Sequence, residues 1–174
     1  MTILQNSGLT LRPVQPEDTR AFEAFYSDPE VMAIRKYGVL GKQAARSQVQ
    51  GMLDHWAKHG FGMWVVEDGI THEFAGECGL RWLEDGSDVE LSYGLYPQFR
   101  GRGLATEVAR AAICFGVEVL GLQRIVALSR GDNAKSHRVL EKLGMTLEWR
   151  KKKGLHGLVQ YCFLSSEHAS STLS

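Results

Sequence analysis

The stretch of residues 96–106 (the glycine turn), Tyr-Pro-Gln-Phe-Arg-Gly-Arg-Gly-Leu-Ala-Thr, constrains the fold more than any other part of the sequence. It follows a strand-like run and leads directly into a helical apolar pattern. Gly101 and Gly103 lie at the junction, where glycine permits a tight turn and lets a ligand approach the backbone closely. The exposed N–H groups of a first helical turn favour an anion, and Arg100 and Arg102 add positive charge. The pattern predicts a phosphate or pyrophosphate site.

A glycine-rich turn between a strand and a helix also occurs in other kinds of structure. A plain strand-to-helix turn without a ligand remains an alternative when the segment is taken alone. A dinucleotide fingerprint needs Gly or Ala at position 106 and an acidic residue at a strand end about 20 positions later. Here Thr106 is present, and Glu118 falls inside the predicted helix. A P-loop is excluded because the sequence contains no Gly-Lys-Ser/Thr triplet.

The charge of the chain is balanced overall but not along its length. The 174 residues carry 20 Lys and Arg and 20 Asp and Glu. Residues 1–87 hold 8 basic and 12 acidic side chains, whereas residues 88–174 hold 12 basic and 8 acidic ones. A net charge of zero disfavours nucleic acid as the main ligand and a basic membrane anchor. The basic half, which contains the glycine turn, is therefore where we expect an anionic ligand.

The sequence shows the marks of neither a membrane helix nor a secretory signal. No run of about 18 apolar residues occurs, and the N-terminus lacks a basic segment followed by an apolar core. Cys78, Cys114 and Cys162 are isolated in apolar stretches and form no Cys-x-x-Cys pair. We expect buried free thiols in a reducing compartment and no zinc site. These features predict a cytoplasmic protein without a metal ion.

The hydrophobic pattern changes character at the glycine turn. Before it, the predicted elements are a strand at 9–14, helices after Pro16 and over 42–59, and strands at 62–67, 73–82 and 88–96. After it come a helix over 104–120 with Val119 on its inner face, a strand at 124–129, a helix after Asn133, and strands at 145–150 and 158–164.

The order of these elements predicts the fold class. Short turns between the early strands indicate an antiparallel meander, and the later alternation of strands and helices indicates a parallel pairing. We therefore predict an α/β fold with a mixed, mostly antiparallel sheet. The 174 residues are expected to form one domain, with a core over 9–165 and a flexible tail over 166–174.

Three motifs, in order along the chain, resemble those of the GCN5-related N-acetyltransferases. Residues 98–103, Gln-x-x-Gly-x-Gly, are similar to the acetyl-coenzyme A motif of that family. Residues 133–145 are similar to its second cofactor helix, with Met145 in place of an aromatic residue. Residues 89–95, Val-Glu-Leu-Ser-Tyr-Gly-Leu, resemble a strand of the subgroup that acetylates the N-termini of ribosomal proteins. The resemblance covers residues 9–165.

The resemblance implies two splayed parallel central strands, flanked by helices, that hold acetyl-coenzyme A between them. In that fold the backbone N–H groups of 100–105 bind the pyrophosphate, the backbone near Leu95 pairs with the pantetheine, Asn133 reaches the pantetheine and Ser136 lies near the sulfur. The cofactor-binding residues so implied are Leu95, Gln98, Arg100, Gly101, Arg102, Gly103, Leu104, Ala105, Asn133 and Ser136. Candidates for contact with the 3′-phosphate are Arg130, Lys135 and Arg138.

The implied reaction is direct attack of an amine on a thioester carbonyl. Because an ammonium is not nucleophilic, a base, or a water chain to one, must remove a proton. Glu90, beside the acetyl site, is the first candidate for this base, and Glu77 on the neighbouring strand is the second. Many family members use a tyrosine as general acid, but that position is Leu140 here. In the ribosomal subgroup a serine three residues after the asparagine has this role, so the resemblance assigns Ser136 as the proton donor, with Tyr93 as an alternative.

The resemblance also implies what the enzyme acts on. The acceptor is expected to be a protein N-terminal amine, as in the ribosomal subgroup, or a small-molecule amine. A catalytically silent module that binds acyl-coenzyme A is the alternative function. The acidic half, residues 1–87, is expected to supply an acceptor wall suited to a cationic amine, and the protein is expected to be a monomer or a homodimer.

Two other clusters allow a functional or a structural interpretation. His55 and His59 have metal-ligand spacing on a predicted helix, but no third ligand is evident, so we expect an exposed or partly packed pair. His55, Trp56 and Phe61 are alternatively candidates for lining an acceptor site. The run Arg150–Lys153 is expected to be a solvated strand end. Its functional alternative is contact with RNA or an acidic partner near the acceptor site.

Overall fold

The computed structural model describes residues 8–166, and within them seven strands form one mixed sheet. The strands are β1 (Leu9–Pro13), β2 (Met63–Asp68), β3 (Phe74–Trp82), β4 (Val89–Leu95), β5 (Arg124–Arg130), β6 (Thr146–Lys151) and β7 (Leu158–Leu164). The α-helices are α1 (Thr19–Ser27), α2 (Pro29–Met32), α3 (Lys42–His59), α4 (Leu104–Glu118) and α5 (Ala134–Lys142), with 3-10 turns η1 (Pro16–Asp18) and η2 (Pro97–Phe99).

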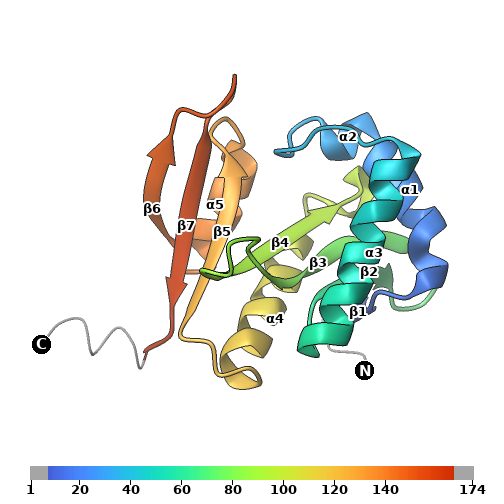
Figure 1. Cartoon of the computed structure of the whole chain (residues 1–174), viewed down its shortest axis with the longest axis horizontal. Helices are drawn as coiled ribbons and strands as arrows, with labels where there is room; N and C mark the ends of the chain where they lie inside the picture. The colour runs from blue at the N-terminus through green and yellow to red at the C-terminus, as the bar shows by residue number, and fades with distance from the viewer. Residues whose placement is uncertain (1–7, 167–174) are drawn as a thin grey trace, which may run out of the picture.

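The strand order β1-β2-β3-β4-β5-β7-β6 confirms the predicted α/β fold class. Strands β1 to β4 form the antiparallel meander, and β5, β7 and β6 form a second antiparallel group. The two groups meet at β4 and β5, which run parallel. Figure 1 shows the two groups diverging from this junction. The structure thus has the splayed central strands that the resemblance implied.

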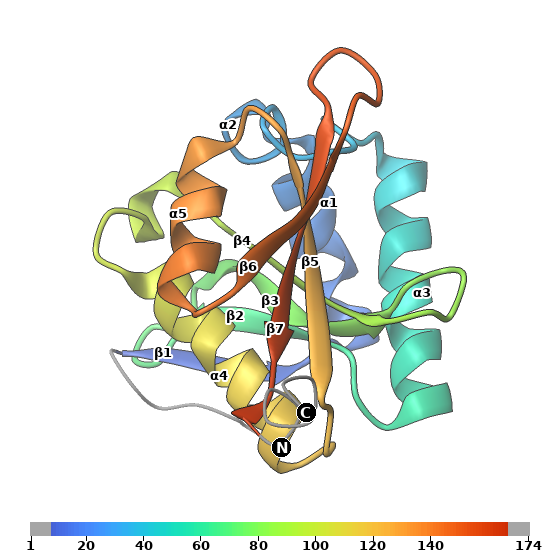
Figure 2. The same cartoon turned by 90° about the vertical axis from the view of Figure 1, so that its left-hand side faces the viewer.

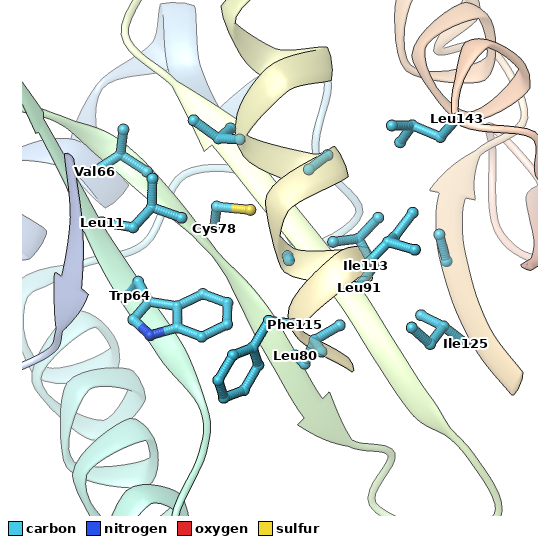
Figure 3. Packing of buried hydrophobic residues seen from close by; sticks show 14 of the residues in the cluster. Leu11, Trp64, Val66, Cys78, Leu80, Leu91, Ile113, Phe115, Ile125 and Leu143 are labelled. Carbon is cyan, nitrogen blue, oxygen red and sulfur yellow. The ribbon is translucent and has the colours of Figure 1, made fainter. Parts of the chain in front are cut away.

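Helices cover both faces of the sheet, so the core has two layers (Figure 2). The alternation of side chains along β2 sends Trp64 and Val66 to the face covered by α4, and Met63 and Val65 to the face covered by α1 and α3. Figure 3 shows Phe115 of α4 against the Trp64 side of this core. Because both faces are buried, the central strands are held rigidly and can position a site between them.

The outer stripe of α4 corrects two predictions. Cys114 is exposed, although we expected all three thiols to be buried; Cys78 and Cys162 are buried and free. With 3.6 residues per turn, Cys114 lies on the same solvent-facing stripe as Glu107 and Arg110, so its apolar sequence neighbours do not bury it. Val119 was predicted on the inner face of this helix, but it follows the last helical residue and is 65% exposed.

Parts of the remaining predictions lie outside the described residues. The tail expected over 166–174 is described only at its first residue, so its flexibility remains a prediction. No helix within residues 8–166 is long and apolar enough to cross a membrane. The same residues contain no group of three or more His, Cys, Asp or Glu side chains arranged to hold a metal ion.

Candidate active site

The gap between β4 and β5 is the centre of the candidate site. Their parallel ladder has one registered pair, Glu90 with Val126, after which the strands separate. A small pocket of about 90 Å³ lies in the gap, bounded also by α5 and by the segment after α2. Its lining includes Glu90, Asn133 and Ser136. The structure therefore brings together residues from two predicted motifs, and these residues lie up to 46 positions apart in the sequence.

The glycine turn lies at the other end of the candidate site, at the N-terminus of α4. Gly101 and Gly103 have φ angles of +81° and +71°, which L side chains rarely adopt, so the turn requires glycine. Within residues 8–166, the six successive backbone N–H groups from Gly101 to Thr106 have no hydrogen-bond acceptor. A run of free N–H groups at a helix N-terminus fits an anionic phosphate group. This fit supports the expected pyrophosphate site.

Arg100 differs from the other residues of the turn because the fold already uses it. Its backbone N–H donates to Pro97, so the free N–H groups begin at Gly101 and not at Arg100 as expected. Its side chain donates to the Leu95 carbonyl oxygen at 2.9 Å and to the Glu30 carbonyl oxygen at 3.3 Å. Burial lowers the pKa of this guanidinium. Arg100 therefore braces the end of β4 against α2.

Asn133 and Ser136 begin α5 beside the pocket. The Asn133 side-chain oxygen accepts from the Ser136 N–H at 3.2 Å and caps the helix, which leaves the Asn133 amide hydrogens free to donate to a ligand. The Ser136 hydroxyl lies 3.0 Å from the hydroxyl of Tyr93 on β4. Burial raises the pKa of Tyr93 to about 12. Leu140, at the position of the common family tyrosine, is buried in the same lining.

Glu90 is buried in the pocket wall between two cations. Its Oε1 lies 3.2 Å from Lys36 Nζ, and its Oε2 lies 3.3 Å from Arg81 Nε. Each carboxylate oxygen has two lone pairs, so one lone pair on each oxygen remains available to accept a proton. A buried carboxylate without partners would be costly, and these two contacts explain how the fold keeps this one in place.

Glu77, the second candidate base, is equally buried and is held in a separate network. It accepts from Tyr26 Oη at 2.5 Å and from Arg35 Nη1 at 2.7 Å. Burial, followed by the Glu77 charge, raises the pKa of Tyr26 well above its ordinary value. Arg35 lies over Gly94, where an added Cβ would come 2.9 Å from its Nη1. Sequence reasoning missed Tyr26, Arg35, Lys36 and Arg81, because no local pattern marks partners so distant along the chain.

A large cleft of about 1270 Å³ adjoins the small pocket on the side away from α4 and α5. Glu90, Arg81 and Lys36 line both, so the pocket opens into the cleft. The residues that line the cleft come from α3, the β3–β4 hairpin, the end of β5 and the arm that joins β6 to β7. Figure 2 shows where these elements lie in the fold. We had expected the acidic half, residues 1–87, to supply the acceptor wall. The walls of the cleft come instead from both halves of the chain.

Several predicted side chains have structural tasks instead. Arg130 pairs with Asp132 at 2.7 Å and donates to the Ala33 carbonyl oxygen at 2.6 Å, so it is not a free cation for a 3′-phosphate. The His55 Nδ1 contacts the Phe61 carbonyl oxygen at 2.8 Å, and its Nε2 accepts from the Trp82 N–H at 3.0 Å. These contacts fix a neutral His55, and burial lowers its pKa. His55 is thus partly packed at the edge of the large cleft and His59 is exposed, which agrees with the expected exposed or partly packed pair.

The geometry of the site bears on the class of the protein. A small pocket in a split sheet opens into a wide cleft, and the glycine turn with its free N–H groups follows the end of β4, one of the two strands that bound the pocket. The free N–H groups fit the phosphates of a co-substrate, and the cleft has room for a second substrate. This arrangement agrees with the class that the resemblance implied, an acyltransferase that uses an acyl-coenzyme A.

Comparison with known proteins identifies the family. The family described as "Acetyltransferase (GNAT) domain" matches residues 8–146. The "Uncharacterized N-acetyltransferase YoaA" of Bacillus subtilis is 31% identical over 150 residues, which are 84% of each chain. The chain therefore belongs to the GNAT acetyltransferase family and is an N-acetyltransferase.

Two relatives have more specific names. The "Putative ribosomal N-acetyltransferase YdaF" of Bacillus subtilis is 24% identical over 93% of this chain and 94% of its own. The spermidine N(1)-acetyltransferase of Escherichia coli K12 is 27% identical over 81% of this chain and 74% of its own.

Solved structures agree with this assignment. An acetyltransferase from Agrobacterium tumefaciens has a TM-score of 0.82 at 27% identity and covers 95% of both chains. RimL, a ribosomal L7/L12 alpha-N-protein acetyltransferase solved with coenzyme A, has a TM-score of 0.77 at 19% identity, covering 94% of this chain and 98% of its own, and thus shares the fold.

Proposed function

We propose that this enzyme acetylates the N-terminal amine of a protein or peptide, with acetyl-coenzyme A bound in the β4–β5 gap and the acceptor in the large cleft. The observation that carries the proposal is the shared wall of the two cavities. Glu90 lines both, so an amine that enters from the cleft meets a carboxylate where the gap begins. The similarity to a putative ribosomal N-acetyltransferase over 93% of this chain supports a protein N-terminus as the acceptor.

The chain's own residues would divide the binding of the co-substrate. The free N–H groups of residues 101–106, with Arg102 beside them, bind the pyrophosphate, and the Asn133 amide donates to the pantetheine. Gln98 lies exposed at the mouth of the turn, and Leu104 and Ala105 contribute backbone N–H groups. Lys135 and Arg138 are exposed on α5 and remain the candidates for the 3′-phosphate.

Proton transfers at the nitrogen and at the sulfur accompany the reaction. Acetyl-coenzyme A supplies an activated acyl carbonyl. Glu90 accepts a proton from the acceptor ammonium, directly or through water, because only the neutral amine can form the new N–C bond. When the C–S bond breaks, the Ser136 hydroxyl donates a proton to the sulfur, and the second proton that the nitrogen loses returns through water to the hydroxyl pair of Ser136 and Tyr93. Burial raises the pKa of Tyr93 to about 12, so Tyr93 is protonated before and after the reaction. Backbone N–H groups of β4 on its open side would stabilise the oxyanion.

A substrate panel tests the proposed function. Purified enzyme is supplied with acetyl-coenzyme A and with peptides of varied N-termini, polyamines and amino acids, and release of coenzyme A thiol is followed. We expect turnover with peptide amines and none with peptides whose N-terminus is already acetylated. Preferred turnover of a polyamine would contradict the N-terminal acceptor. Tight coenzyme A binding without turnover on any amine would support the silent module instead.

A further inference from the structure

The basic run Arg150–Lys153 has an unexpected position in the fold. Strand residues alternate between two faces, and the structure places Trp149, Lys151 and Lys153 in the lining of the large cleft, whereas Arg150 and Lys152 are outside it. The cleft that receives the acceptor thus has a wall with two lysines and an indole. The functional alternative for this run, contact with an acidic partner near the acceptor, therefore has a structural basis.

These two lysines differ from the other cations of the cleft because the fold does not use their charges. Arg35 pairs with Glu77, Lys36 and Arg81 pair with Glu90, and Arg130 pairs with Asp132. In contrast, neither Lys151 nor Lys153 forms an ion pair with any residue in the described range 8–166. The ammonium of Lys151 lies 4.4 Å from the centre of the Trp149 ring, which orients it without neutralising it.

The arm that carries the lysines is tied to the cofactor side of the molecule. His156 Nδ1 lies 3.0 Å from the Asp132 carboxylate, and the Gly131 N–H donates to the Gly157 carbonyl oxygen at 3.2 Å. Asp132 immediately precedes Asn133, which lines the small pocket. The lysine wall is therefore held in a defined position relative to the reaction centre, as a specificity-determining surface must be.

The opposite rim of the cleft is acidic. Glu84 and Asp85, in the β3–β4 hairpin, line the cleft and form no ion pair within residues 8–166. Asp85 uses one oxygen to accept from the backbone and hydroxyl of Ser87. Walls of opposite sign fit an acceptor that carries both charges. An acceptor that is only cationic, such as a polyamine, would face unfavourable charge at the lysine wall.

We propose that the acceptor is an amine that also bears a carboxylate, and that Lys151 and Lys153 bind this carboxylate while the amine enters the β4–β5 gap. The inference rests on the proposed function and names its substrate class. A peptide with Asp or Glu just after its N-terminal residue has this chemistry, and so does a free dicarboxylic amino acid. Lys151 and Lys153 then determine which amine is selected and take no part in the chemical step.

Matched substrates test this inference. The wild-type enzyme is assayed with Ser-Asp-Glu-Gly-Ala-amide and with Ser-Asn-Gln-Gly-Ala-amide, which differ only in charge. We expect kcat/KM to be about tenfold higher for the acidic peptide at about 50 mM salt and the difference to shrink at about 500 mM salt. In the double variant Lys151→Gln/Lys153→Gln the preference should disappear, through KM and not kcat. The neighbouring Lys152→Gln is the control, and it should keep the preference.

The outcomes separate this inference from the proposed function. Equal use of both peptides by the wild type, or an unchanged preference in the double variant, would show that Lys151 and Lys153 do not bind the acceptor carboxylate. The proposed N-terminal acetyltransferase activity would still stand. Preference for spermidine overturns the carboxylate requirement. No turnover on any amine, with coenzyme A bound normally, overturns the proposed function and this inference together. Free glutamate and free glutamine are also supplied, to distinguish an acidic peptide from a free dicarboxylic amino acid as the acceptor. Acetylation of free glutamate, but not of free glutamine or of the peptides, supports a small-molecule acceptor with the same chemistry.

Discussion

Under the proposed function, the glycine turn and the buried carboxylate of Glu90 serve the same reaction by opposite means. The turn presents the free backbone N–H groups of 101–106, which depend on the positive φ of Gly101 and Gly103, whereas its side chains Phe99 and Leu104 pack into the core. The gap depends on side chains paired across the fold, such as Arg35 with Glu77 and Lys36 with Glu90. Binding of the co-substrate thus depends on backbone conformation, whereas chemistry and acceptor choice depend on tertiary packing.

Among the variants that test this contrast, Gly103→Val is expected to have the largest effect, and it tests the dependence of co-substrate binding on backbone conformation. The Val side chain would lie where the phosphate must approach, and the loss of two charge-assisted hydrogen bonds should weaken coenzyme A affinity about 100-fold or more, measured by calorimetry. Gly121→Val is the matched control, because Gly121 has a similar φ of +68° and equally free space around its Cβ. Both variants should lose about 1–2 kcal/mol of stability from backbone strain. Unchanged coenzyme A affinity in Gly103→Val would contradict the assigned turn.

In the β4–β5 gap, Glu90→Gln is expected to have the next largest effect, and this effect is on kcat. Loss of the base should lower kcat about 100-fold and remove the rise of rate with pH, while coenzyme A affinity stays near that of the wild type. Lys36→Met serves as the control, because it removes one ion pair of Glu90 and keeps the carboxylate. Its rate should still rise with pH. A wild-type pH profile in Glu90→Gln would rule out Glu90 as the base.

Tyr26→Phe tests the side-chain packing in the wall of the small pocket and leaves the glycine turn unchanged. The variant removes the hydrogen bond to Glu77 and keeps the pair between Glu77 and Arg35. We expect the free energy of unfolding to fall by about 2 kcal/mol in urea titrations, with coenzyme A affinity unchanged. An unaltered urea midpoint would show that the second carboxylate network does not stabilise the fold.

The smallest expected effect concerns Tyr93 at high pH. Its pKa is raised to about 12 in the folded protein, from an ordinary value of 10.0. Above pH 10 an unfolded chain therefore releases a proton that the folded chain retains, so stability falls as pH rises from 10 towards 12. Between about pH 9 and 10.5 the loss should be about 1 kcal/mol. The variant Tyr93→Phe should lose less stability over this interval, and equal slopes would contradict the assignment.

The same contrast explains what the sequence could predict. The glycine turn and the start of a helix after Asn133 are local features, since each needs particular residue types within a few positions, and the structure has both as predicted. The pairing of Glu90 with Lys36 joins residues 54 positions apart, and that of Tyr26 with Glu77 spans 51. No local pattern encodes such contacts. The exposure of Cys114 was not predicted for another reason. Its apolar neighbours in the sequence suggested burial, but its position on the helix places it on the solvent-facing side.

The single registered pair between β4 and β5 has a consequence for the lifetime of the protein. An interior sheet seam that lacks its usual ladder is where thermal opening should start. A ligand lodged in that seam supplies the missing cross-links, and at about 100 times its dissociation constant it would add about 2.7 kcal/mol to the stability of the folded state. Cells short of acetyl-coenzyme A would thus hold a less durable enzyme, so that metabolic supply sets its abundance as well as its rate.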